Sequence, residues 1–270
     1  MKIRFAWPAT ACLLLVTWTY GTVLAQQSRS PIRGTRPPAP AIRANSLFQL
    51  STLDALAQGV YEGSMPLGDL KHYGDFGLGT FDALNGEMVV LDGVVYQVTS
   101  DGVVHRPAGD VLIPFISVTH FNPDPDTSFT IDQSLDMSQF TGLVEQQKLP
   151  SPNYFYAFRV AGTFRSVKAR SVPKQYPPYQ PLSEVIPNQA VFPMADVDGT
   201  AVCLWTPQFA AGINAGGMHC HFISDDRSRG GHALDFVIDN VTVEMSTLRQ
   251  QITVLPDQEA FQQVPLPAAP

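Results

Sequence analysis

The sequence predicts a fold in which antiparallel β-strands dominate and helices are few. Residues 86–91 and 94–98 are apolar runs on either side of Asp92-Gly93, a dipeptide that favours the tight turn of a β-hairpin. A second turn signal follows at residues 100–102 and leads into another short apolar run. Residues 216–222 and 230–236 form a further pair of strand-like runs around a turn-rich segment. Such repeated hairpin signals indicate a meander of antiparallel strands.

The last of these hairpins carries the most informative residues of the chain. His219 and His221 are two apart, and alternate side chains of a strand share a face. Residues 225–231 are rich in Asp, Ser and Gly, so the chain can reverse and return His232 to that face. Three convergent imidazoles with no fourth protein ligand are typical of a catalytic zinc site. The alternative is that the three residues are ordinary core or surface histidines. On a strand, Cys220 would face the opposite side and act as a packing residue.

The first 25 residues differ from the rest of the chain. Lys2 and Arg4 precede an apolar run at residues 11–16, and the segment ends in Val23-Leu24-Ala25, a small-residue cleavage pattern. We interpret residues 1–25 as a secretory signal peptide and expect a periplasmic or secreted protein. A membrane anchor is the alternative, but polar residues interrupt the apolar run well short of a full span.

Residues 26–45 contain several Pro and Arg residues and few apolar ones, which predicts a flexible tether. Residues 46–270 then form the folded domain, and a composition that is 44% apolar and 15% charged is ordinary for a globular protein. Cleavage after Ala25 would remove two of the 17 basic residues and none of the 24 acidic ones, so the net charge would fall from −7 to −9. A nucleic-acid partner is therefore not expected.

The start of the domain has helical signals. The apolar positions between residues 47 and 60 fit an amphipathic helix, with Ser51 or Thr52 as N-cap and Gly59 at the stop. A short helix is expected at residues 67–71. The Gly-rich residues 74–81 lack the Lys-Ser/Thr pair of a phosphate-binding loop and lead into strands, so nucleotide binding is disfavoured.

Glu87 opens the strand at residues 86–91 beside a glycine, where a carboxylate can face a cavity or simply be a solvated strand end. A helix is expected near residues 135–147, and residues 173–187 are where a domain boundary would be sought. Further strands are expected at residues 111–121, 154–160, 190–193, 201–206 and 232–245.

Three further residues could have a functional or structural role, namely Arg170 and two cysteines. Arg170 lies in a strand-like stretch, where it is either an exposed cation or a fork for a carboxylate ligand. Cys203 and Cys220 would remain after signal cleavage. Both lie in apolar runs where a buried thiol packs well, so we expect them not to be bridged.

Together, several motifs resemble the α-acetolactate decarboxylase family. They occur in the family's order between residues 47 and 261, and this ordered set is far more specific than any single motif. The matching segments are residues 59–61, 72–81, 85–87, 91–97, 170–172, 218–222 and 230–236.

The resemblance implies an α+β fold of mixed, mainly antiparallel sheets, usually dimeric, and a zinc-dependent lyase that converts 2-acetolactate to acetoin and carbon dioxide. The metal-binding histidines of the family fall on His219, His221 and His232. Its active-site carboxylate falls on Glu87 and its substrate-binding arginine on Arg170. The partner is then a small-molecule substrate, with no membrane contact after signal cleavage.

The chemistry is consistent with these residues. Loss of carbon dioxide from a β-keto acid leaves an enolate, which zinc can stabilise as a Lewis acid. Arg170 would hold the substrate carboxylate, and Glu87 would supply a proton or a further metal contact. Asp225 and Asp235 could orient the imidazoles, although a turn residue and a solvated residue are their simpler roles.

One departure concerns the end of the chain. Family members usually continue with an acidic helix whose glutamate reaches the active site, and residues 255–267 lack an obvious equivalent. Glu259 is a candidate substitute. Two other functions stay open. An exported zinc hydrolase could use the same three histidines to activate water, and the missing glutamate favours a non-catalytic zinc-binding member of the family.

Overall fold

The computed structural model describes residues 45–266. These residues belong to one compact unit. The expected signal peptide, and the tether apart from Asn45, lie outside the described residues. Among residues 45–266, no helix has the length and apolar character needed to cross a membrane.

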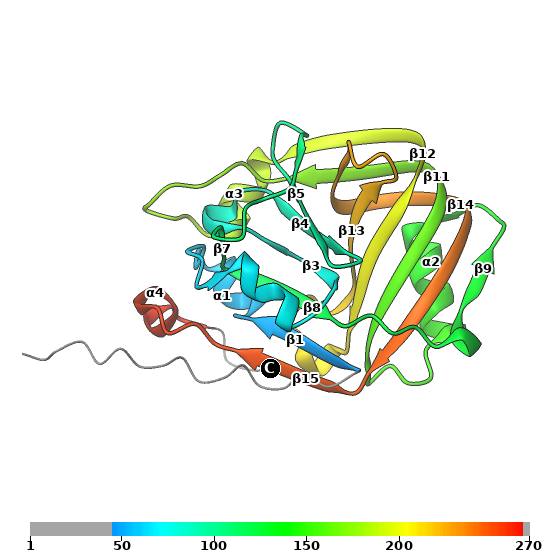
Figure 1. The fold of residues 1–270 in the computed structure, drawn as a ribbon, viewed down its shortest axis with the longest axis horizontal. Coiled ribbons are helices and arrows are strands. Elements are labelled where there is room, and N and C mark those ends of the chain that lie inside the picture. Colours follow the sequence, from blue (N-terminus) through cyan, green and yellow to red (C-terminus); the bar gives the residue numbers. More distant parts are fainter. Residues whose placement is uncertain (1–44, 267–270) are drawn as a thin grey trace, which may run out of the picture. The chain divides into compact units, whose positions relative to one another are not determined.

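Two large β-sheets make up the fold, and nearly all of their pairings are antiparallel (Figure 1). The first is seven-stranded, in the order β15-β1-β8-β3-β4-β5-β6. Its one parallel pairing joins β1 and β15, which makes the sheet mixed. In chain order its strands are β1 (Ser46–Leu50), β3 (Phe76–Thr80), β4 (Glu87–Leu91), β5 (Val94–Val98), β6 (Val104–His105), β8 (Phe115–Thr119) and β15 (Gln250–Val254).

The second sheet has the order β10-β14-β11-β12-β13, with β9 paired to β14. Strand β13 also pairs with β14, so β11, β12, β13 and β14 close into a ring. Its strands are β9 (Phe129–Ile131), β10 (Leu135–Asp136), β11 (Phe155–Ser171), β12 (Ala190–Thr206), β13 (Gly217–Ser224) and β14 (Gly230–Leu248). A small separate pair joins β2 (Met65–Pro66) to β7 (Leu112–Ile113).

Helices are short and lie around the sheets. The α-helices are α1 (Leu53–Ala57), α2 (Met137–Leu143), α3 (Leu182–Val185) and α4 (Glu259–Gln263). A π-helical turn, Val144–Lys148, extends α2. The 3₁₀-helices are Leu67–His72, Asp82–Leu84, Pro125–Thr127, Ile186–Asn188 and Gln208–Ala210.

The apolar core has layers on both sides of each sheet. Between the sheets, Val89 and Leu91 of β4 pack in one cluster with Leu204 of β12 and Ile223 of β13. On the far face of the second sheet, Phe140 of α2 joins the cluster that contains the apolar residues of β11 and β14. The candidate site lies at one end of the layer between the sheets. There, polar side chains take the place of the apolar ones on the strands that face each other.

The sequence-based prediction of mainly antiparallel strands with few helices is confirmed. The helix expected over residues 47–60 is wrong in its first part, because residues 46–50 form β1 between β8 and β15 and are all buried. A strand that is covered on both faces does not alternate between apolar and polar residues. Its sequence can therefore be mistaken for the apolar face of a helix. The helix itself begins at Leu53 with Thr52 as its N-cap and ends before Gly59.

The expectation that the two cysteines are not bridged is also wrong. Cys203 and Cys220 form a disulfide between β12 and β13. The two residues are direct partners in the ladder, with their Cα atoms 4.1 Å apart. Local apolar composition gives no information on which strands become neighbours, so the sequence could not show this pairing.

Candidate metal centre and active site

Strand β13 presents His219 and His221 on the face that points toward the first sheet. The alternate residues Cys220 and Phe222 lie in the cluster on the opposite face. The next residue on the histidine face, Ile223, belongs to the layer between the sheets. The two imidazoles therefore extend an apolar row into the site.

A tight turn brings His232 back beside them. His232 of β14 pairs directly with His221 of β13. Within the turn, the Asp226 carboxylate accepts hydrogen bonds from the hydroxyls of Ser224 and Ser228 and from the Ser228 N–H. Gly231 has φ +134°, and a Cβ there would lie 2.5 Å from the carbonyl oxygen of Arg170. The sequence around the turn thus permits the close approach of β14 to its neighbours.

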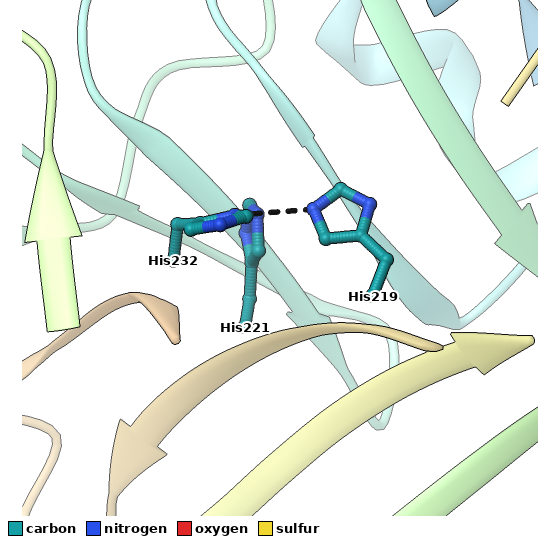
Figure 2. Close-up of side chains that lie close together, drawn as sticks. All are labelled: His219, His221 and His232. Carbon is teal, nitrogen blue, oxygen red and sulfur yellow. Dashed lines mark hydrogen bonds between the residues drawn. The ribbon is translucent and has the colours of Figure 1, made fainter. Parts of the chain in front are cut away.

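The three imidazoles are turned toward one another (Figure 2). Nε2 of His219 lies 3.1 Å from Nδ1 of His232. The centroids of the three rings are 5.0 to 5.2 Å apart. One nitrogen from each ring lies within 4.8 Å of the other two, so these residues could hold a metal ion.

The electrostatic environment keeps the imidazoles neutral at ordinary pH. Burial lowers the pKa of His219 to about 4, and the charge of Arg170 acts in the same direction. Burial also lowers the pKa of His221 and His232 well below the usual value. A neutral imidazole has the lone pair that a metal requires.

The outer ring nitrogen of His221 is also consistent with metal binding. Nδ1 of His221 lies 2.7 Å from the carbonyl oxygen of Met88, so this nitrogen donates its proton and leaves Nε2 free. Nδ1 of His219 is buried and has no hydrogen-bond partner within residues 45–266. A metal bound at Nε2 of His219, the nitrogen that faces His232, would leave this outer nitrogen unpaired, so Nδ1 does not itself indicate a metal.

Arg170 occupies the same row of the second sheet. It is the direct β11 partner of His232, which in turn pairs with His221, so the three residues follow one another across β11, β14 and β13. A bulge in the β11–β14 ladder lies next to this row, between Lys168 and Ala169. Arg170 is therefore not the exposed cation that was its simpler interpretation, since its side chain is 12% exposed.

Glu87 reaches the site from the opposite sheet. It is the first residue of β4, after Gly86, where φ is +91° and a Cβ would lie 2.4 Å from the carbonyl oxygen of Val98. Its Oε1 accepts a hydrogen bond of 2.9 Å from NH1 of Arg170, and its Oε2 lies 3.6 Å from Nε2 of His221. Burial raises the pKa of Glu87, while the positive charge of Arg170 lowers it.

All five residues line one cavity of about 240 Å³. Its remaining lining is mostly apolar and comes from α1, α3, β3, β8, β13, the 3₁₀-helix Asp82–Leu84 and the segment before β13. Sequence reasoning missed these side chains, because no local pattern relates α1 to α3. They are Leu53, Leu56, Leu84, Phe115, Leu182, Ala215 and Met218, together with Gly79 and Thr80.

A buried polar network positions the segment before β13, and sequence reasoning missed it as well. Asn214 Nδ2 donates to the hydroxyl of Ser117, which donates to Oε1 of Gln49. All three side chains are buried, and they come from the segment before β13, from β8 and from β1. Ala215, which lines the cavity, directly follows Asn214 of this network.

Three acidic residues considered from the sequence lie elsewhere. Asp225 is exposed and 3.7 Å from Arg227, and Asp235 is exposed and accepts a hydrogen bond from the N–H of Phe236. Glu259 is exposed on α4 and accepts a hydrogen bond from Gln263. Within the described residues, Glu259 therefore does not act as a substitute carboxylate in the cavity.

Comparison with known proteins gives a consistent result. The profile of the alpha-acetolactate decarboxylase family matches residues 47–268. The alpha-acetolactate decarboxylase of Methanosarcina mazei is 46% identical over 72% of this chain and 66% of its own length. That of Brevibacillus brevis is 41% identical over 83% of this chain and 81% of its own length.

A solved structure is similar over most of its length. The crystal structure of alpha-acetolactate decarboxylase from Bacillus subtilis strain 168 matches with a TM-score of 0.79 and 37% identity, covering 82% of this chain and 93% of that one. Family profile, relatives and fold thus agree with the convergence of histidines, arginine and glutamate in one cavity. The chain belongs to the α-acetolactate decarboxylase family of carbon–carbon lyases.

Proposed function

We propose that this protein catalyses the zinc-dependent decarboxylation of 2-acetolactate to acetoin and carbon dioxide. The observation that carries the proposal is that three neutral imidazoles and the Glu87–Arg170 pair face one largely apolar cavity. The family supports the reaction, and the donor set supports the metal.

Zinc would be held by the imidazoles of His219, His221 and His232. Three neutral nitrogens suit zinc, and three protein ligands are characteristic of catalytic rather than structural zinc sites. When bound, the metal supplies Lewis acidity, which stabilises negative charge on the ketone oxygen of the substrate.

Arg170 would bind the carboxylate of the substrate. Its guanidinium has five donors, and the structure assigns one of them, on NH1, to Glu87. Other donors of the guanidinium would bind the substrate carboxylate inside the largely apolar cavity. The substrate is thus oriented with its leaving carboxylate toward Arg170.

Glu87 would carry the proton that the reaction consumes. Cleavage of the bond to the carboxylate releases carbon dioxide and leaves its electron pair in an enediolate, which must gain a proton at carbon to become acetoin. Burial favours the protonated form of Glu87, so a proton is available at a higher pH than for an exposed glutamate. The carboxylate left behind is stabilised by Arg170 until it regains a proton from water.

The direct test is incubation of the purified mature protein with racemic 2-acetolactate, with and without a chelator, followed by zinc addition. The proposal expects acetoin formation that the chelator abolishes and zinc restores. Zinc binding without acetoin formation would favour a non-catalytic protein. Hydrolysis of ester or amide substrates without decarboxylation would favour the hydrolase.

We also propose that the protein is exported and forms a homodimer. The disulfide between Cys203 and Cys220 supports export, since such bonds persist in oxidising compartments. The dimer rests on the family resemblance. Fractionation of producing cells and light scattering on the purified protein test the two proposals separately.

A further inference from the structure

The disulfide lies directly behind the histidines. Cys220 occupies the position between His219 and His221 on β13, and its side chain points to the other face of the strand. Its partner Cys203 is in β12, and both cysteines are almost completely buried, with exposures of 1% and 0%. The bond therefore joins the metal-binding strand to its neighbour from inside the core.

The first half of β13 has a ladder on one side only. Strand β12 pairs with all of β13, from Gly217 to Ser224. Strand β14, in contrast, pairs only with the second half, at residues 221–223. His219 therefore lies in the part of the strand that has a single described neighbour, and Gly217 at its start has φ +82° with open space around it.

The register of β13 decides which of its side chains face the cavity. A slip of one residue moves every side chain of a strand to the opposite face. For β13, such a slip would turn His219 and His221 into the core and Cys220 toward the cavity. A cross-link at Cys220 prevents this slip at the position where the second ladder is missing.

We propose that the Cys203–Cys220 disulfide is a positioning element of the metal centre, which fixes the register of β13 and so holds His219 beside His221 and His232. The proposal rests on the proposed function, because it assumes that the three histidines bind zinc. It differs from a general stapling role, since a staple would raise the stability of the fold without changing the affinity for the metal.

The experiment compares zinc affinity with stability. The double variant Cys203→Ala/Cys220→Ala removes the bond, and Val144→Ala removes buried volume from the same core at a residue outside β12 and β13. Zinc dissociation constants are measured by chelator competition at a temperature at which circular dichroism shows each protein folded, and Tm is measured without metal. If the alanine pair does not fold, Cys203→Val/Cys220→Ala retains more of the buried volume.

We expect both variants to have a lower Tm, but only the cysteine variant to bind zinc about 10- to 100-fold more weakly, as is typical when a group that orients a ligand is lost. Equal zinc affinity of the cysteine variant and the wild type would overturn the proposal, as would an equal loss of affinity in Val144→Ala. Failure of the wild type itself to bind zinc would contradict the proposed function instead.

Discussion

Oε1 of Glu87 accepts a 2.9 Å hydrogen bond from NH1 of Arg170, and the two residues come from different sheets. Their side chains are 8% and 12% exposed, so the pair is shielded from water. The removal of one partner from such a pair leaves the other buried without compensation. A substitution at either position therefore also changes the environment of the other residue, and Glu87→Gln is the milder change because glutamine keeps a hydrogen-bond acceptor for Arg170.

Replacement of Glu87 by glutamine should lower kcat by about 10²- to 10⁴-fold, because a positioned proton donor is lost while the shape is kept. Zinc content should be unchanged. Glu259→Gln is the matched control, since Glu259 is exposed on α4 and its loss should not alter turnover. Acetoin formation by both variants at equal zinc content is the measurement, and full activity of Glu87→Gln would remove Glu87 from the mechanism.

Arg170→Ala should raise KM far more than Arg170→Lys, because lysine keeps a positive charge but not the planar fork that can bind a carboxylate at two atoms. Arg165→Ala is a suitable control. Arg165 lies on the same strand but is 61% exposed, where it pairs with Asp239. Steady-state kinetics with 2-acetolactate decide the matter, and a normal KM for Arg170→Ala would contradict substrate binding by this residue.

Elemental analysis of the wild type should find about one zinc per chain, and alanine at His219, His221 or His232 should abolish tight binding, since two nitrogens make a much weaker site. His105→Ala should retain the metal, because His105 is exposed on β6 and hydrogen-bonded to Thr99 in the turn between β5 and β6. An active wild-type protein without any transition metal would exclude the metal centre.

The stability of the turn that returns β14 to the site should depend on pH through the carboxyl group of Asp226. Hydrogen bonds from the Ser224 side chain first, and then from Ser228, lower the pKa of Asp226 to about 2. Since the folded pKa is below the unfolded one, this stabilisation is complete above about pH 4 and is lost as the pH falls toward about 2. The Tm difference between wild type and Asp226→Ala should therefore be constant near neutral pH and narrow in acid.

Asp225→Ala serves as the comparison for this effect. The Asp225 side chain is 62% exposed and lies 3.7 Å from Arg227, and exposed pairs of this kind contribute little. Its Tm should remain close to that of the wild type across the same pH range. A Tm difference for Asp226→Ala that does not narrow in acid would show that its carboxylate charge is not what holds the turn.

The sequence predicted those parts of the structure that depend on local patterns. The Asp92-Gly93 hairpin, the strands around it and the alternation of His219 and His221 all follow from a side-chain period of two and from turn chemistry. The helix expected near residues 135–147 is present as α2 and its π-helical extension, after the short strand β10.

What the sequence could not predict depends on how distant segments pair. Nothing near Glu87 or Arg170 indicates that β4 and β11 face each other across a cavity. The separate strands expected at residues 190–193 and 201–206 are one long strand, β12, and the Gly-rich segment became β3, because the neighbouring strands supply ladders that local composition does not reveal. The disulfide and the apolar lining from α1 and α3 were missed for the same reason.

All five site residues lie on strands of the two sheets, and none lies on a connecting loop. A ligand that enters such a site removes little conformational entropy from the protein, because the backbone is already held by its ladders. Metal binding should accordingly leave the backbone almost unchanged, and zinc added to the metal-free protein should find its ligands in place without any folding step. Hydrogen exchange of β13 and β14 before and after zinc addition would then differ in rate but not in which amides are protected.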